Sequence, residues 1–216
     1  MRRCLVLLLA PLLLLAGCVK FDTSMELKDE NHIHLKATVG ISKSMVGMSG
    51  GNLPPEFSDC SNSKESAGVG SSDKAEKLED EEYIGCTFTK DTTAAELNKE
   101  PGMKVTFDED EVSAQVSSDL FRDSGRSGEA IGATMFSDFK VSVTFPGKVV
   151  SHSGSSTVDG NTVTWTDPKD LFSSSGLTAA SKRSNGIPAW IWIGAAVVGL
   201  AIAGAVVVIG SKKKGP

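Results

Sequence analysis

Apolar and polar residues alternate along much of the chain between residues 19 and 165, a period of two that predicts β-strands with one buried face. From Val19 to Ile41, apolar side chains occupy almost every second position on both sides of a polar turn at Lys28 to Asn31. Two alternating runs joined by a short polar turn predict a β-hairpin at the start of the domain.

The same alternation returns in three later stretches. It predicts a strand at Tyr83 to Thr89 and two short strands around the acidic turn Asp108 to Asp110. The last stretch alternates from Phe139 to Phe145, and Asp159-Gly160, a strong hairpin signal, then leads into another alternating run. The sequence therefore predicts an α+β domain over residues 18–165, mainly an antiparallel sheet of hairpins with one or two short helices.

Two stretches inside this domain break the alternation in favour of helix. Several glycines, followed by Pro54 and Pro55, interrupt it from Ser42 to Leu53, which predicts a short helix or a loop. Residues 91–96 predict the start of a helix, with Thr92 or Thr93 as its N-cap.

Two other stretches contain too few apolar side chains to predict ordered structure. Residues 61–82 predict a mobile acidic insert, or a charged surface helix around 73–82. Residues 166–186 are rich in Ser, Gly and Lys and predict a flexible tether after the domain.

The first 17 residues have the layout of a secretory signal peptide, because two arginines precede an apolar run from Leu5 to Ala16. The run is shorter than the roughly 20 residues that a membrane-spanning helix needs. It ends in Leu15, Ala16, Gly17 and Cys18, which resemble the lipobox of bacterial lipoproteins. The resemblance implies cleavage before Cys18 and a diacylglycerol on its sulfur. The alternative is an ordinary signal peptide with an incidental cysteine.

Residues 187–209 predict a transmembrane helix. This uncharged apolar run of 23 residues covers about 35 Å at 1.5 Å per residue. Trp190 and Trp192 near its start fit the membrane interface, and three lysines in the tail 210–216 place that side in the cytoplasm. Both ends of the chain thus predict that the region between them lies outside the cytoplasmic membrane.

The predicted helix carries a stripe of small residues at Ala195, Gly199 and Ala203. Such a stripe allows close approach of a second helix, so self-association is a further expectation. The two anchors also predict an orientation. The domain stands on its amino-terminal edge, the tether 166–186 reaches back to the membrane, and the acidic tip at 108–111 points away.

Charge argues against a nucleic-acid partner. All 27 acidic residues lie between positions 19 and 186, against 17 Lys and Arg in the same region. Residues 56–111 alone hold 16 acids and 6 bases. Such a surface repels phosphate backbones.

Two cysteines remain once Cys4 leaves with the signal peptide and Cys18 carries lipid. Cys60 and Cys86 both lie in the region predicted to be outside the cytoplasm, where disulfides persist, so we expect them to be bonded to each other. The alternative of two thiols as metal ligands lacks a CxxC motif or a neighbouring histidine.

Catalytic and metal-binding motifs are weak. Residues 47–51 match G-x-S-x-G around Ser49, but the prolines that follow cannot continue as the helix that a nucleophile elbow requires. His32 and His34 could present two imidazoles on one strand face, with His152 or an acid as a third ligand. They fall on the polar side of the predicted strand, where exposed histidines are ordinary. We therefore expect no metal site and no cofactor.

The opening "GCVKFDTSMELKDE", the later "FKVSVTFPGKVVSHSGSSTVDGNTVTWT" and the final membrane helix with its lysine tail resemble the LppM-type lipoproteins of actinobacteria. The resemblance implies an envelope-exposed α+β domain without catalytic activity and with affinity for membrane glycolipids. It transfers no ligand-binding residues to this chain.

Two functions remain open from the sequence. The first is a non-catalytic domain, held at the cytoplasmic membrane by both anchors, that binds a lipid, a glycolipid or another envelope protein. Its expected site is a concave apolar surface on the strands at 139–145 and 83–88. The alternative is an envelope hydrolase that uses Ser49 beside His152 or His34 and an acid.

Overall fold

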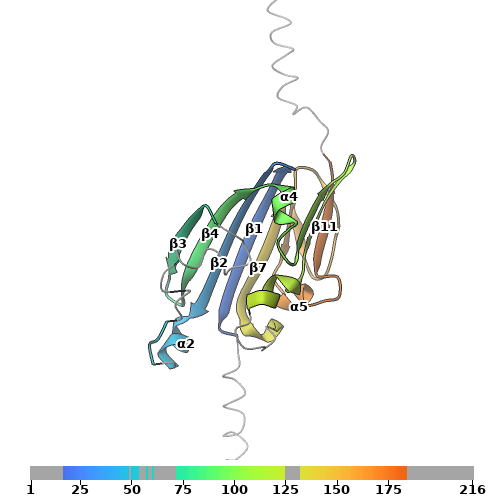
Figure 1. The fold of residues 1–216 in the computed structure, drawn as a ribbon. Helices are drawn as coiled ribbons and strands as arrows, with labels where there is room; N and C mark the ends of the chain where they lie inside the picture. The colour runs from blue at the N-terminus through green and yellow to red at the C-terminus, as the bar shows by residue number, and fades with distance from the viewer. Residues whose placement is uncertain are drawn as a thin grey trace, which may run out of the picture. The chain divides into compact units, whose positions relative to one another are not determined.

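The computed structural model describes residues 17–48, 50–53, 57, 60, 72–124 and 132–183 of the 216-residue chain. They form a mainly β domain with two sheets and a few short helices (Figure 1). The larger sheet has the strand order β3-β4-β2-β1-β7-β10-β9 and the smaller one the order β5-β6-β11-β8. The strands of the larger sheet are β1 (Val19–Asp29), β2 (His32–Ser42), β3 (Lys74–Glu79), β4 (Tyr83–Thr92), β7 (Phe136–Thr144), β9 (Thr157–Asp159) and β10 (Thr162–Trp165).

The predicted hairpins are confirmed. β1 and β2 pair antiparallel, with Phe21 opposite Val39 and Leu27 opposite Ile33, so the alternating apolar residues share one face. β9 and β10 meet at the predicted Asp159-Gly160 turn, where Gly160 has a φ of 57°. That left-handed conformation favours glycine.

The sheet is mixed rather than purely antiparallel. β1 also pairs with β7, and this pair is parallel: Phe21 lies opposite Phe139 and Met25 opposite Val143. The first strand of the domain therefore lies in the middle of the large sheet, between β2 and a strand more than a hundred residues later in the chain.

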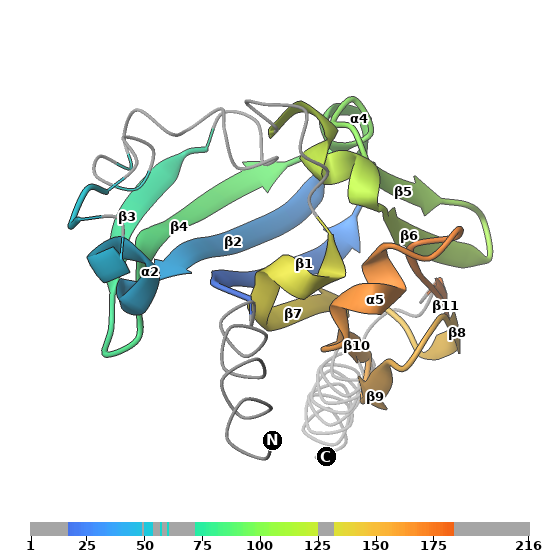
Figure 2. The same cartoon turned by 90° about the horizontal axis from the view of Figure 1, so that it is seen from below.

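The smaller sheet contains β5 (Met103–Phe107), β6 (Glu111–Val116), β8 (Val149–His152) and β11 (Leu177–Lys182), and it lies beside the β7–β10 half of the larger sheet (Figure 2). The predicted hairpin around Asp108 to Asp110 is the β5–β6 pair. Side chains from both sheets join one apolar core, which includes Val112, Val143 and Trp165.

The prediction of a flexible tether at 166–186 is wrong for residues 166–183, the part that the structure describes. Residues 168–171 form the helix α5 (Pro168–Leu171), and β11 pairs with both β6 and β8. Its small residues Ala179, Ala180 and Ser181, which resemble a linker in sequence, are buried. The domain therefore continues to Lys182 instead of ending at 165.

The charged helix predicted around 73–82 is also wrong. Lys74 to Glu79 form β3, an edge strand of the larger sheet that pairs with β4. Charged side chains on an edge strand oppose pairing with a second sheet, which explains the composition that suggested an insert.

The short helices include α2 (Lys43–Met48), α4 (Ala94–Leu97), η2 (Ser118–Ser124) and η3 (Ala133–Met135). α2 occupies the first half of the stretch 42–53, for which a short helix or a loop was predicted. The N-cap of α4 is Thr93, one of the two predicted caps, whose hydroxyl accepts a hydrogen bond from the amide of Glu96.

Several predictions lie outside the described residues. They concern the signal peptide, the remainder of the acidic insert at 61–71, the membrane helix at 187–209 and the basic tail. Within the part of the chain that the structure describes, no helix is both long and apolar enough to cross a membrane.

Candidate functional site at the Cys18 end

Cys18 lies at one end of the larger sheet, where its backbone is fixed on both sides. Its amide donates to the carbonyl of Met135 at 3.0 Å, and its carbonyl accepts from the amide of Ser42 at 2.8 Å. Ser42 is followed directly by α2, and Met135 belongs to η3. We call this part of the domain, with Cys18, α2, η3 and the β3–β4 turn, the Cys18 end.

The lipobox residues are only partly described. Leu15 and Ala16 lie outside the described residues. A Cβ added to Gly17 would lie 2.4 Å from the carbonyl carbon of Phe136, so no larger side chain fits there without a shift of the backbone.

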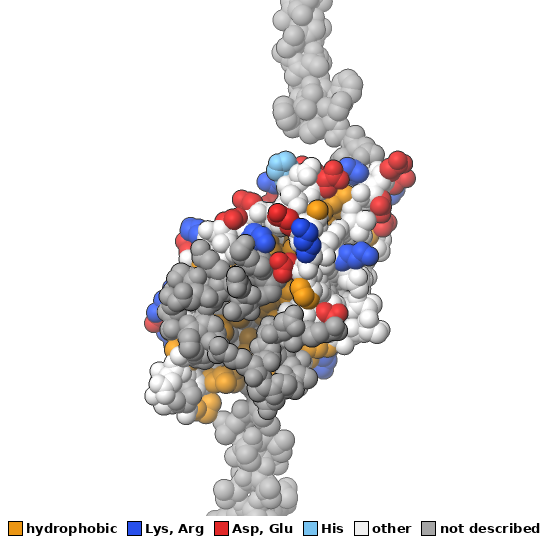
Figure 3. All heavy atoms as spheres, in the orientation of Figure 1, with side chains coloured by type: hydrophobic (Ala, Val, Ile, Leu, Met, Phe, Trp, Pro, Cys, Tyr) orange, Lys and Arg blue, Asp and Glu red, His pale blue; other side chains and the backbone are white. Residues whose placement is uncertain are grey.

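Three exposed methionines lie on the two helices next to Cys18. Met45 and Met48 lie on α2 with 45% and 69% of their surface exposed, and Met135, the residue that accepts from the Cys18 amide, is 43% exposed. Figure 3 shows exposed hydrophobic side chains at this end of the domain. We call Met45, Met48 and Met135 the methionine collar.

A cluster of phenylalanine rings lies directly behind the collar. Phe136 follows Met135 in the chain, and its ring centroid lies 6.1 Å from that of Phe21 and 5.6 Å from that of Phe139. Phe121 from η2 and Phe172 from the end of α5 pack against Phe136, at 5.6 and 6.2 Å. Phe121 and Phe172 are only partly buried, so the cluster has an accessible edge.

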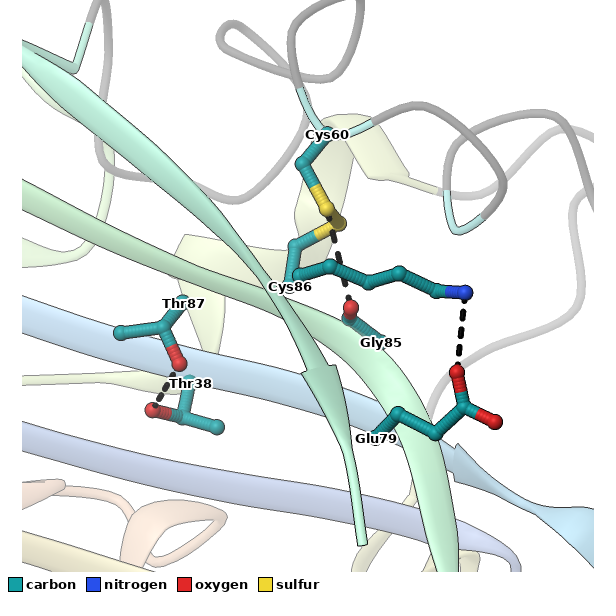
Figure 4. Close-up of a disulfide and its surroundings, with 7 residues drawn as sticks. Thr38, Cys60, Glu79, Gly85, Cys86 and Thr87 are labelled. Atoms are coloured by element: carbon teal, nitrogen blue, oxygen red, sulfur yellow. Dashed lines mark hydrogen bonds and ion pairs between the residues drawn. A yellow bond between two sulfur atoms is a disulfide. The ribbon is translucent and has the colours of Figure 1, made fainter.

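The disulfide is confirmed and lies at the same level of the sheet as this cluster. Cys60 and Cys86 are bonded, with their Cα atoms 5.6 Å apart (Figure 4). Cys86 in β4 lies opposite Val39, which in turn lies opposite Phe21. On the other face of the same strands, Thr38 and Thr87 share a hydrogen bond of 3.0 Å.

Polar contacts also fix the Cys18 end. The Lys20 ammonium donates a hydrogen bond to the Asp138 carboxylate, and this bond raises the pKa of Lys20. The same ammonium lies 5.1 Å from the centre of the Tyr83 ring. In the β3–β4 turn the Asp80 carboxylate accepts from the amides of Tyr83 and Glu82, and these bonds lower the pKa of Asp80.

The candidate catalytic residues are not brought together in the described part. Each histidine has a local partner: His32 pairs with Asp29, His34 with Asp91, and His152 with Ser156. His32 and His34 lie on the polar side of β2, as predicted, because Ile33 and Leu35 are buried. Ser49 lies outside the described residues, and no cluster of three metal-ligating side chains occurs among the described ones.

The apolar groove expected on the strands at 139–145 and 83–88 is not open. Phe139, Val141, Val143 and Phe145 are all buried in the core, and so is Phe88. The accessible aromatic edge at Phe121 and Phe172 was missed from the sequence, because neither residue belongs to a strand with alternating apolar positions.

The opposite end of the sheet is polar. It holds the β1–β2 turn, α4 and the acidic β5–β6 turn, and we call it the Arg183 end. Arg183 donates to the Asp110 carbonyl from its amide, at 2.8 Å, and to the Asp108 carbonyl from its guanidinium, at 2.9 Å. Its neighbour Lys182 donates to Lys148, just beyond the far end of β7. The described chain therefore begins at one end of β7 and leaves at the other (Figure 1).

Comparisons with known proteins identify a family for this chain. The family model of the LppM domain matches residues 20–181. The NMR structure of the folded domain of LppM from Mycobacterium tuberculosis aligns with 77% of this chain and 91% of its own, at 14% identity and a TM-score of 0.42. No curated protein sequence matches the chain. Because the family model covers most of the chain, including both sheets, the chain belongs to the LppM domain family.

Proposed function

We propose that this protein is a lipoprotein of the cell envelope, held at the outer face of the cytoplasmic membrane by a diacylated Cys18 and by a membrane helix at 187–209. Its domain binds the acyl part of a membrane lipid or glycolipid and performs no catalysis. Membership in the LppM family supports the assignment to envelope lipoproteins.

The observation that carries the lipid-binding part is the position of the phenylalanine cluster. The cluster of five rings includes Phe136, which follows the residue that accepts from the Cys18 amide, and two of the rings, Phe121 and Phe172, are only partly covered. Partly exposed aromatic rings next to a bilayer favour contact with acyl chains, because the free energy falls when apolar surface is removed from water. The cluster thus has the chemistry to receive an acyl chain.

The absence of catalysis is part of the proposal, with the Ser49 hydrolase as its alternative. The three histidines pair with Asp29, Asp91 and Ser156, so none of them is held beside a second titratable group in a buried setting. A hydrolase would need one of them next to Ser49. A variant with Ser49, His34 and His152 replaced by Ala keeps full function in a complementation assay if the binding proposal holds, and loses it while still folded if the hydrolase alternative holds.

Lipid retention tests the binding site. The full-length protein is purified from its own membranes in mild detergent, and the bound lipids are extracted and identified by mass spectrometry. We expect retained lipid to fall several-fold in the double variant Phe121→Ser, Phe172→Ser. Phe107→Ser is the matched control, because Phe107 is also a partly buried phenylalanine but lies beside the acidic turn of the Arg183 end.

Two outcomes would contradict the lipid site. One is retained lipid no greater than in an unrelated membrane protein prepared in the same way. The other is an equal loss of lipid in the Phe107 control and in the double variant. Recovery of a bound protein instead of a lipid, lost in the double variant, would mean that the ligand at Phe121 and Phe172 is an envelope protein.

A further inference from the structure

The methionines of this domain divide sharply by position. Five of the six follow residue 17. Met25 and Met103 are buried in the core, as expected for apolar side chains. The other three are exposed, and they lie on α2 and η3, the two helices joined to the Cys18 backbone through Ser42 and Met135. The other large apolar side chains exposed in the described part are single valines on β8 and β9, Val150 and Val158, so a group of three is found only on α2 and η3 among the described residues.

The backbone explains why the three residues gather there. β1 and β2 pair so that Val19 lies opposite Ile41, which places the residues after β2 beside Cys18. The amide of Met45 lies 3.3 Å from the Ser42 hydroxyl, and the amide of Ser42 donates to Cys18. On the other side, Met135 accepts directly from the Cys18 amide. α2 and η3 thus hold their methionines on both sides of one residue.

We infer that the methionine collar inserts into the outer leaflet of the membrane, at the boundary between headgroups and acyl chains, and that it sets the orientation of the domain on the bilayer. The inference rests on the proposed lipid on Cys18, because a diacyl chain at that residue brings the collar into contact with the leaflet. Methionine suits this surface, since its flexible and polarizable side chain adapts to a fluid apolar environment.

Charge does not provide the attraction. Lys43 of α2 donates from its amide to the carbonyl of Glu82, and its ammonium lies 3.7 Å from Glu79. The β3–β4 turn brings Glu79, Asp80 and Glu82 to the same end, where Lys43 and Lys77 pair with Glu79, so these groups leave no excess of basic charge to attract anionic headgroups. Insertion must come from the apolar collar, so it is insensitive to salt.

A depth measurement in vesicles tests the inference. The full-length protein, with its lipid, carries a single thiol introduced by Met45→Cys, labelled with an environment-sensitive fluorophore and reconstituted into phosphatidylcholine vesicles with brominated acyl chains. Val158→Cys is the matched control, because Val158 is 42% exposed, close to the 45% of Met45, but lies on β9, away from Cys18. We expect several-fold stronger quenching at 45 than at 158, unchanged in 1 M salt.

A second variant separates the collar from the anchor. Met48→Gln and Met135→Gln, added to Met45→Cys, leave Cys18 intact but make the collar polar. We expect quenching at position 45 to fall toward that at 158. Equal quenching at 45 and 158, or no change on adding the two glutamines, would overturn the inference.

The same sample reports on the anchor by mass spectrometry of its N-terminal peptide. A lipidated Cys18 together with an unquenched probe at 45 would reject the collar and keep the proposed anchor. A Cys18 without lipid would reject the anchor and, with it, the contact of the collar with the leaflet.

Discussion

The two ends of the domain have opposite surfaces. The Cys18 end presents three exposed methionines and the edge of a phenylalanine cluster, and the disulfide lies close to it. The Arg183 end presents the acidic turn Asp108 to Asp110 and exposed pairs such as His32 with Asp29. One end exposes apolar side chains and the other exposes charged ones, although both are built from strands of the same sheets.

The path of the chain bears on how the two proposed anchors would hold one domain. The tether that was predicted to reach back from residue 166 is instead α5 and β11, and the described chain leaves at the Arg183 end. β1 and β7 span the sheet, and 11 residues of β1 cover about 36 Å at roughly 3.3 Å per residue. The stretch 166–183 is therefore part of the domain and does not supply the flexible reach that the predicted orientation required.

The largest expected effect is the loss of free energy of unfolding when a phenylalanine ring is removed from the Cys18 end, compared with one from the Arg183 end. Phe21→Ala removes a fully buried ring that contacts three other phenylalanines, and we expect it to lower the free energy of unfolding by about 3 to 5 kcal/mol. Phe107→Ala costs less, because its ring is only partly buried. Urea denaturation of the two variants in mild detergent measures both. An equal loss would show that the Cys18 end is no better packed than its opposite.

The next effect concerns the disulfide. Replacing both Cys60 and Cys86 by Ala opens a loop with a sequence separation of 26, which costs roughly 3 kcal/mol on the chain-entropy argument. The control variant Thr38→Val, Thr87→Val changes the opposite face of the same strands and removes one hydrogen bond, worth about 1 kcal/mol. Denaturation compares the variants. Thiol labelling of the unreduced, unfolded wild-type protein provides a second test. Labelling of both Cys60 and Cys86 would show that they are not bonded.

Removal of a helix cap from each end is expected to lower stability by less than the changes above. Thr93 caps α4 at the Arg183 end, and Asp167 caps α5 near the phenylalanine cluster. Replacement of either by Ala costs about 1 kcal/mol. Hydrogen exchange distinguishes them: we expect only Asp167→Ala to reduce protection around Phe172 and Phe136. Loss of protection at both ends in both variants would mean that the ends are not independent.

The smallest effect is a pH dependence from the β3–β4 turn. Hydrogen bonds from the amides of Tyr83 and Glu82 lower the pKa of Asp80 below its unfolded value of about 3.9. A lowered folded pKa means that this contribution to stability is complete above the unfolded pKa and is lost as the pH falls through the folded one. Asp80→Asn should therefore have a slightly lower melting temperature than wild type at pH 7 and the same one at pH 2. A difference that persists at pH 2 would contradict this origin.

Local features were predictable from the sequence. The β1–β2 hairpin follows from alternation and a polar turn, and the Thr93 cap follows from the residues around it. The disulfide follows from the predicted location outside the cytoplasm and from elimination of the other cysteines. Each depends on neighbouring residues or on the number of cysteines. The side on which His32 and His34 lie followed from the same alternation.

Long-range features were not predictable. The parallel β1–β7 pair joins strands more than a hundred residues apart, and alternation does not say which strands meet. β11 was missed because Ala179, Ala180 and Ser181 are small enough to fit between two strands and therefore resemble a linker. The register of the β1–β2 hairpin brings α2, with two of the collar methionines, beside Cys18. The third, Met135, lies there only because β7 pairs with β1, which the sequence does not predict.

The claim that the Cys18 end faces the membrane depends first on the lipid at Cys18. Mass spectrometry of the protein extracted from its own membranes tests this directly, with Cys18→Ala as the control. The account predicts a mature chain that begins at Cys18 and carries the mass of a diacylglycerol, and an unprocessed precursor in the control. A mature chain that begins elsewhere, or a Cys18 without added mass, would contradict it.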